Sequence, residues 1–209
     1  MTTVQQIGGD FYDAFPLGDD EYCVAIGDVA GKGVPAALFM VRTITALRAE
    51  LLKNQSLEVA ISKLNQLICG NNPSPMFATL IVGILNRRAG SFRYLDAGHG
   101  AVILGGGVGF KQLPLRAGIP VGILDTAEYE VQSIDLKSGD VAFPYTDGVT
   151  EAVTQEHKIF TLESLMDGLL AEAATSTSEL ANWVRLSIAQ HIDGAPLSDD
   201  LTMVIVRCC

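Results

Sequence analysis

The sequence is short of the residues that zinc sites and nucleic-acid surfaces require. It has four cysteines and three histidines among 209 residues, with no Cys-x-x-Cys pair and with the histidines scattered at His99, His157 and His191. This spacing argues against a structural zinc site. Lysine and arginine total 14 against 24 acidic residues, so the net charge is −10. That balance predicts no nucleic-acid binding, because such binding depends on basic side chains that neutralise phosphates.

Membrane and export signals are also missing from the sequence. No uncharged apolar stretch reaches the roughly 18 residues of a membrane-spanning helix. The first ten residues, MTTVQQIGGD, lack the basic and apolar regions of a signal peptide. With 48% hydrophobic residues, the chain has enough apolar side chains to form a substantial core. Together with cysteines typical of a reduced compartment, these features predict a cytoplasmic protein with no membrane segment.

The pattern of apolar residues predicts an α+β chain. Helices are expected at 34–53, 56–68, 162–172 and 178–191, the second of them capped by Ser56. Strands are expected in EYCVAIGDV, ending at Asp28, and in MFATLIVGILN, GSFRYLDAG, AVILGG, GFKQL, EYEVQSIDL, GDVAFPYTDG and LTMVIVR. Most of these strands come in hairpins, which favours antiparallel sheets over βαβ units. Pro144 is unusual in its strand, since it has no N–H to donate to a ladder.

The glycine cluster in IGDVAGKGVPAALFM has three interpretations. A Walker A loop does not fit, because Gly31-Lys32 is followed by Gly33 where that motif needs Ser or Thr. A dinucleotide-binding turn fits the spacing Gly31-x-Gly33-x-x-Ala36, but Glu50, the acid about 20 residues on, falls in a predicted helix. It remains the alternative with a small-molecule ligand. The third interpretation is a sharp strand-to-helix turn, in which Lys32 is a solvated loop residue.

Aspartates stand next to four predicted strands, namely Asp10, Asp28, Asp147 and the neighbours Asp199 and Asp200. Each alone is compatible with a turn residue. If the strand ends converge, however, two carboxylates about 4 Å apart would repel by roughly 4 kcal/mol at an effective dielectric near 20. Protonation or bound cations would remove that repulsion. Oxygen ligands select Mg²⁺ or Mn²⁺ over zinc, and two such ions can activate a water and hold a phosphoryl oxygen.

At these residues the sequence resembles a known family. The ordered segments are GGDFYD, IGDVAGKGVPAALFM, MFATL, LDAGH, GIPVGI, YTDGVTEA and SDDLTMV. They are similar to segments of the metal-dependent type-2C serine/threonine protein phosphatases, in the bacterial SpoIIE/RsbU branch, and the resemblance runs nearly end to end. It implies one catalytic domain over 1–209, folded as an αββα sandwich of two antiparallel sheets flanked by helices.

The resemblance also implies the site residues. The family's metal ligands match Asp10, Asp28, Asp147 and Asp199, with Val29 offering its backbone carbonyl. These aspartates would hold two Mn²⁺ or Mg²⁺ ions, bridged by Asp28, and so are the expected catalytic residues. Asp200 is the alternative to Asp199 as the last ligand.

Two other polar residues in these segments have weaker assignments. Asp13 is expected to be structural. His99 is also expected to be structural, with a catalytic acid as the alternative, because the AGH stretch is followed by GAVIL rather than by the family's usual polar residue and proline. A second departure is IFTLESL, where the family usually carries Phe-Gly. Neither departure removes a proposed metal ligand.

The implied function is dephosphorylation of a phosphoserine or phosphothreonine protein by a metal-activated water. In this branch the usual substrate is a phosphorylated anti-sigma-factor antagonist. A binding module without turnover is the alternative, which the loss of an acid would have favoured. The family also implies that the chain is part of a longer protein with an upstream sensor or receiver domain, that it forms a homodimer, and that helices at about 34–70 act as a switch.

Overall fold

The structure is a computed structural model, and it describes residues 8–53, 55–106, 109–171, 176–197 and 199–208. The chain divides into two compact units. Unit 1 comprises residues 1–100 and 115–135, and unit 2 comprises residues 101–114 and 136–209. The prediction of a single catalytic domain over 1–209 stays a prediction.

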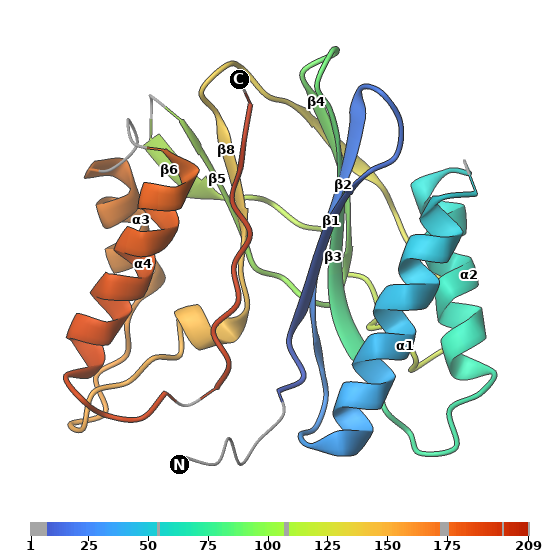
Figure 1. The fold of residues 1–209 in the computed structure, drawn as a ribbon, viewed down its shortest axis with the longest axis horizontal. Helices are drawn as coiled ribbons and strands as arrows, with labels where there is room; N and C mark the ends of the chain where they lie inside the picture. The colour runs from blue at the N-terminus through green and yellow to red at the C-terminus, as the bar shows by residue number, and fades with distance from the viewer. Residues whose placement is uncertain (1–7, 54, 107–108, 172–175, 198, 209) are drawn as a thin grey trace. The chain divides into compact units, whose positions relative to one another are not determined.

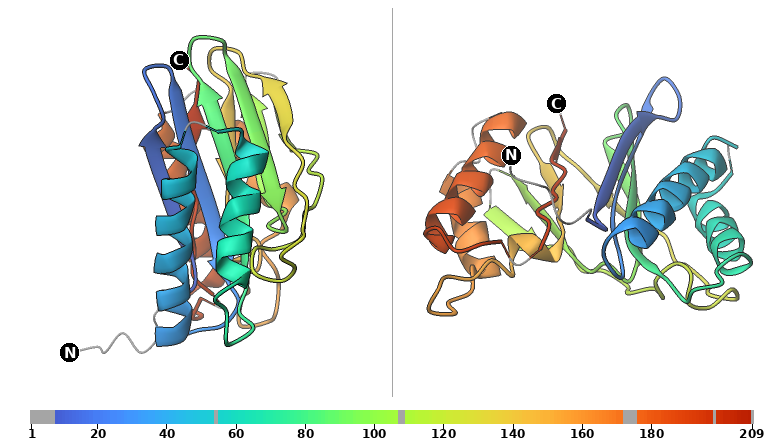
Figure 2. Two further views of the ribbon diagram at one scale, coloured as in Figure 1. Left: turned by 90° about the vertical axis from the view of Figure 1, so that its right-hand side faces the viewer. Right: turned by 60° about the horizontal axis from the view of Figure 1, so that its bottom comes forward.

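Unit 1 contains a five-stranded antiparallel sheet with two helices on one face (Figure 1). In sheet order, the strands are β1 (Phe11–Pro16), β2 (Glu21–Val29), β3 (Ala78–Asn86), β4 (Ser91–Ala97) and β7 (Gln132–Asp135). The helices are α1 (Val34–Leu51) and α2 (Leu57–Cys69), which lie side by side (Figure 2).

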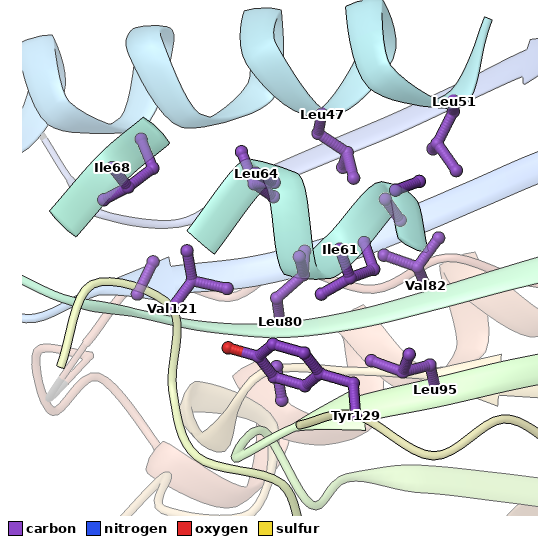
Figure 3. Close-up of a cluster of buried hydrophobic side chains, with 14 of the residues drawn as sticks. Leu47, Leu51, Ile61, Leu64, Ile68, Leu80, Val82, Leu95, Val121 and Tyr129 are labelled. Carbon is purple, nitrogen blue, oxygen red and sulfur yellow. The ribbon is translucent and has the colours of Figure 1, made fainter. Parts of the chain in front are cut away.

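The apolar spacing of α2 explains how it packs in unit 1. Ser56 caps the helix, since its side chain accepts a hydrogen bond from the Val59 N–H. The inner face of the helix is fully buried and carries Leu57, Ile61, Leu64 and Ile68. These residues form one cluster with side chains of α1 and the sheet, among them Leu47, Leu80, Val82 and Leu95 (Figure 3). Burying each such side chain contributes about 1.5–3 kcal/mol.

Unit 2 contains a four-stranded antiparallel sheet in the order β6-β5-β8-β9. Its strands are β5 (Val102–Gly106), β6 (Gly109–Gln112), β8 (Val141–Pro144) and β9 (Val206–Arg207). A 3₁₀ turn, η1 (Asp147–Val149), follows β8, and the helices are α3 (Leu162–Ala171) and α4 (Thr177–Ile192). Phe143, Leu165, Leu180 and Val184 belong to the core of this unit.

The α+β prediction is confirmed: the described residues form two antiparallel sheets and four α-helices. Each predicted helix is present, with ends within two residues of the expected ones. β2 covers the whole EYCVAIGDV segment and so ends at Val29, one residue beyond Asp28. The dinucleotide interpretation is wrong, because β1 and β3, the described neighbours of β2, both run antiparallel to it and Glu50 lies in α1. A dinucleotide-binding turn needs a parallel βαβ unit.

The closing strand is shorter than the predicted LTMVIVR segment, because β9 contains only Val206 and Arg207. The preceding residues do run beside β8, since the Val204 N–H bonds to the Pro144 carbonyl at 3.0 Å. Pro144 has no N–H to return that bond, so the ladder is interrupted at this rung. The unusual proline therefore ends β8 and shortens its partner.

The strand predicted from EYEVQSIDL is also shorter, because only Gln132–Asp135 pair with β4 as β7. The β4–β7 pairing ends at Tyr94. Two residues further along β4, the Asp96 carbonyl faces the same edge of the strand and accepts the Gly118 N–H at 3.0 Å. A different segment thus occupies the position that residues 128–131 would have filled. None of the described helices is long and apolar enough to cross a membrane.

Candidate metal site

Asp10 and Asp28 lie opposite each other across the first hairpin of unit 1. The antiparallel register of β1 and β2 continues past Phe11 to Gly9, whose carbonyl accepts the Val29 N–H at 3.2 Å. Asp10 and Asp28 therefore form a non-hydrogen-bonded pair on one face of the sheet, which is the closer kind of antiparallel pair. Like charges directly opposite destabilise a sheet. A shared cation would offset that cost.

Gly9 leaves room for two oxygen atoms beside this pair. A Cβ at Gly9 would lie 2.5 Å from the Val29 carbonyl oxygen and 2.8 Å from Asp28 Oδ1. Both oxygens therefore border the same space, which any larger residue at position 9 would fill. Carboxylate and carbonyl oxygens are the donors that Mg²⁺ and Mn²⁺ prefer. The donor set of unit 1 fits the ions predicted from the sequence.

The glycines after Asp28 form the turn into α1. Gly31 has φ 111° and Gly33 has φ 82°, in the left-handed region that glycine adopts without strain. Gly33 is the N-cap of α1, and Pro35 follows in the first turn, where a missing N–H costs nothing. The interpretation as a strand-to-helix turn is confirmed, and Lys32 is an exposed residue within it.

In unit 2, the turn at Asp147 lies against residues 199–200. Asp147 is the first residue of η1, directly after the end of β8. A Cβ at Gly148 would overlap the Asp200 carbonyl oxygen. Only glycine permits this close approach, which explains the Asp-Gly sequence of the turn. The structure thus places Gly148, the neighbour of Asp147, against the backbone of both candidates for the last ligand.

Thr146 and Thr202 fix the same junction. The Thr146 N–H bonds to the Thr202 carbonyl at 3.0 Å, and the Thr146 hydroxyl accepts the Thr202 N–H at 3.1 Å. Asp199 and Asp200 are both exposed. Asp199 Oδ1 accepts the Asp200 N–H at 2.9 Å. The choice of Asp199 over Asp200 stays a prediction, as does the sharing of ions by aspartates of the two units.

The sequence alone does not single out Thr79, although it lies in the MFATL segment. On β3, Thr79 is the register partner of Asp28, so its side chain lies on the same sheet face. The Thr79 hydroxyl is 2.9 Å from His99 Nδ1 and 3.4 Å from the Asp28 carbonyl oxygen. The polar row of Asp10, Asp28 and Thr79 therefore extends to His99.

Asp96, in the LDAGH segment, was likewise not predicted as part of the site. Its residue is only 2% exposed. Oδ1 accepts the backbone N–H groups of His99 at 2.7 Å and Gly100 at 3.2 Å. Burial raises the pKa of this carboxyl, and the two backbone bonds partly oppose the increase. Asp96 therefore holds the loop that carries His99.

Asp13 has the structural role predicted for it. Its two carboxylate oxygens accept hydrogen bonds from Arg48 of α1, at 2.9 Å from Nε and 2.5 Å from a terminal nitrogen. The Arg48 guanidinium also stacks over the Phe15 ring, 4.5 Å from its centre. The Asp13–Arg48 pair ties β1 to α1.

In the residues that the structure describes, no three His, Cys, Asp or Glu side chains form a ready metal cluster.

Comparison with known proteins identifies the family. The model of the Stage II sporulation protein E (SpoIIE) family matches residues 18–208. The chain belongs to the SpoIIE family. This membership confirms the resemblance seen in the sequence.

Relatives of this SpoIIE-family chain include two curated bacterial proteins. It is 30% identical to Protein IcfG of Synechocystis over 97% of the chain and 36% of IcfG. It is 28% identical to the phosphoserine phosphatase RsbU of Bacillus subtilis, over 97% of the chain and 60% of RsbU. The chain thus spans about a third to three fifths of the length of these relatives.

The fold of the SpoIIE-family chain also occurs in solved structures. The SiaA-PP2C domain of Pseudomonas aeruginosa matches with a TM-score of 0.84 at 22% identity, over 96% of this chain and 80% of that one. At this identity, the likeness shows the fold. The predicted enzyme class agrees with the phosphoserine phosphatase name of RsbU.

Proposed function

We propose that the chain is the catalytic part of a metal-dependent phosphoserine/phosphothreonine protein phosphatase in bacterial signalling. The observation that carries this proposal is the Asp10–Asp28 pair beside the Val29 carbonyl, in the space that Gly9 leaves open. An apolar sheet has no structural need for two facing carboxylates at the end of its first hairpin. Membership of the SpoIIE family and the name of RsbU support the same function.

The proposed ligand set combines residues from both units. Asp10, Asp28 and the Val29 carbonyl hold the ions from unit 1, while Asp147 and Asp199 supply the remaining carboxylates, with Asp200 as the alternative to Asp199. Two bound Mn²⁺ or Mg²⁺ ions would activate a water for attack on phosphorus and neutralise charge on the phosphoryl oxygens. The chain's own task is to fix carboxylate oxygens for this purpose, which requires no cysteine or serine nucleophile.

The proposed substrate is a phosphorylated anti-sigma-factor antagonist, and the proposed location of the reaction is the cytoplasm. This follows the family's signalling role, which the kinship with RsbU supports. We also infer that a sensor or receiver domain precedes the chain in the full-length protein, and that the protein forms a homodimer. The greater length of IcfG and RsbU supports an additional domain.

Release of phosphate from a phosphoserine protein, measured with Mn²⁺ and after chelation, tests this function. We expect activity only with metal. Asp28→Asn should lower kcat/KM by about 100-fold or more, because ligated oxygens and ions supply several kcal/mol of transition-state stabilisation.

Asp19→Asn is the matched control, since Asp19 is an exposed acid in the turn between β1 and β2. It removes the same charge and should leave activity within about twofold of the starting protein, as expected for a surface site. Activity that persists after chelation, or that survives Asp28→Asn, would contradict the proposed function. Tight binding of the phosphoprotein without metal uptake or turnover would instead indicate a binding module.

A further inference from the structure

The rung that carries Asp28 lies at the end of the β2–β3 ladder. Asp28 pairs with Thr79 and the Val29–Ala78 pair follows, with one further bond from the Ala30 N–H to the Phe77 carbonyl at 2.9 Å. The ends of secondary structure open more readily than the middle. A metal ligand, however, must be held within about 0.5 Å of its productive position. Side-chain contacts near the end of β2 would add to the backbone bonds that hold Asp28 in place.

The Thr79 hydroxyl contacts both the end of β2 and the His99 ring. The Asp28 carbonyl oxygen can only accept, so the 3.4 Å contact uses the single hydroxyl proton of Thr79. The 2.9 Å contact between the Thr79 hydroxyl and His99 Nδ1 must then be donated by the imidazole. A Thr79 hydroxyl that donates to Asp28 therefore requires the Nδ1–H form of His99, and the tautomer is a test of this hydrogen-bond chain.

Asp96 brings His99 to this position. Its Oδ1 binds two consecutive backbone N–H groups, those of His99 and Gly100. These bonds hold the loop after β4 in the shape that directs Nδ1 at Thr79. A buried carboxylate that accepts two N–H groups of one loop is a strong local constraint, because hydrogen bonds to charged groups are stronger than hydrogen bonds between neutral groups.

We propose that His99 is a positioning residue of the metal site, which acts on Asp28 through Thr79 and is itself held by Asp96. The chain of contacts runs from the loop after β4, through Thr79 of β3, to Asp28 near the end of β2. It restrains the rung of Asp28 and so keeps its carboxylate aligned with Asp10. The link to metal binding rests on the proposed function, whereas the hydrogen-bond chain does not.

The test compares Thr79→Val with Thr79→Ser in the metal-free and the metal-loaded protein. Valine has nearly the shape of threonine but no hydroxyl, while serine retains the hydroxyl. In metal-free protein, nitrogen NMR of the imidazole should show Nδ1–H for the starting protein and for Thr79→Ser. In Thr79→Val, we expect loss of that preference and faster amide exchange at Val29 and Ala30, with an unchanged melting temperature.

The metal-loaded arm measures Mn²⁺ affinity by calorimetry. Thr79→Val should weaken binding about 10–100-fold, as is typical when the partner of a metal ligand is removed, and Thr79→Ser should restore it. His99→Leu and His99→Asn form a second pair, since only the asparagine can donate near the position of Nδ1.

Three results would overturn the positioning role. They are an Nε2–H imidazole in the starting protein, equal amide exchange in the valine and serine variants, and equal Mn²⁺ affinity in these two variants. Failure of the starting protein to bind Mn²⁺ would overturn the proposed function, while the NMR and exchange results would still decide the hydrogen-bond chain.

Discussion

At the scale of the residue, Asp96 is buried and its two carboxylate oxygens differ in their hydrogen bonds. Oδ1 accepts two backbone bonds, whereas Oδ2 has no hydrogen-bond partner among the described residues. Burial raises the pKa of this carboxyl above its ordinary value of 3.8. The folded protein therefore binds this proton more tightly than the unfolded chain does. The contribution of Asp96 to stability is greatest at low pH and is lost as the pH rises through the folded pKa.

Asp96→Asn should change this pH dependence. Asparagine keeps an oxygen that can accept the N–H groups of His99 and Gly100, but it does not ionise. We expect the free energy of unfolding of the variant to increase relative to that of the starting protein as the pH rises above about 4, because only the starting protein has this raised pKa. Urea unfolding at several pH values measures this difference. A difference that does not vary with pH would show that Asp96 is not the group responsible.

At the scale of the element, α2 depends on its buried stripe more than on its exposed face. Leu64 is fully buried, whereas Leu67 is 46% exposed on the same helix. Leu64→Ala should lower the free energy of unfolding by about 2–5 kcal/mol, because it removes packed methyl groups and leaves a cavity. Leu67→Ala should change it by no more than about 0.5 kcal/mol. Urea unfolding of both variants tests the difference, and equal losses would contradict the assigned packing.

The same contrast explains which elements could be predicted from the sequence. The stripe of α2 and its Ser56 cap are local signals, and both appear where expected. The short β9 results from a missing N–H at Pro144, a residue 62 positions before Val206. The short β7 results from a bond between Asp96 and Gly118. Such competition between distant segments cannot be predicted from the apolar periodicity of the residues that are left unpaired.

The candidate site divides in the same way. The motifs identify Asp10 and Asp28 because acids stand out beside apolar strands. Their direct opposition depends on the β1–β2 register, which the intervening turn sets and the motif does not show. Thr79 looks like an ordinary strand threonine until β2 and β3 are paired. Its contact with His99 joins two segments whose relation appears only in the folded unit.

At the scale of the whole molecule, the proposed ligands make a prediction about how metal affects stability. Asp10 and Asp28 belong to unit 1, whereas Asp147 and Asp199 belong to unit 2. If the ions need carboxylates from both sets, neither set should retain full affinity alone. If each unit instead binds an ion independently, the loss of one acid should leave the other unit's binding intact.

Thermal unfolding with and without Mn²⁺ distinguishes these cases. At an ion concentration 100 times Kd, binding to the folded state alone adds about 2.7 kcal/mol, which should raise the Tm measurably and should be reversed by chelation. We expect Asp28→Asn and Asp147→Asn each to abolish most of that increase. Asp193→Asn is the matched control, because it removes an exposed acid in a left-handed conformation that asparagine also tolerates. A Tm increase that survives Asp147→Asn but not Asp28→Asn would confine the metal to unit 1 and remove Asp147 from the ligand set.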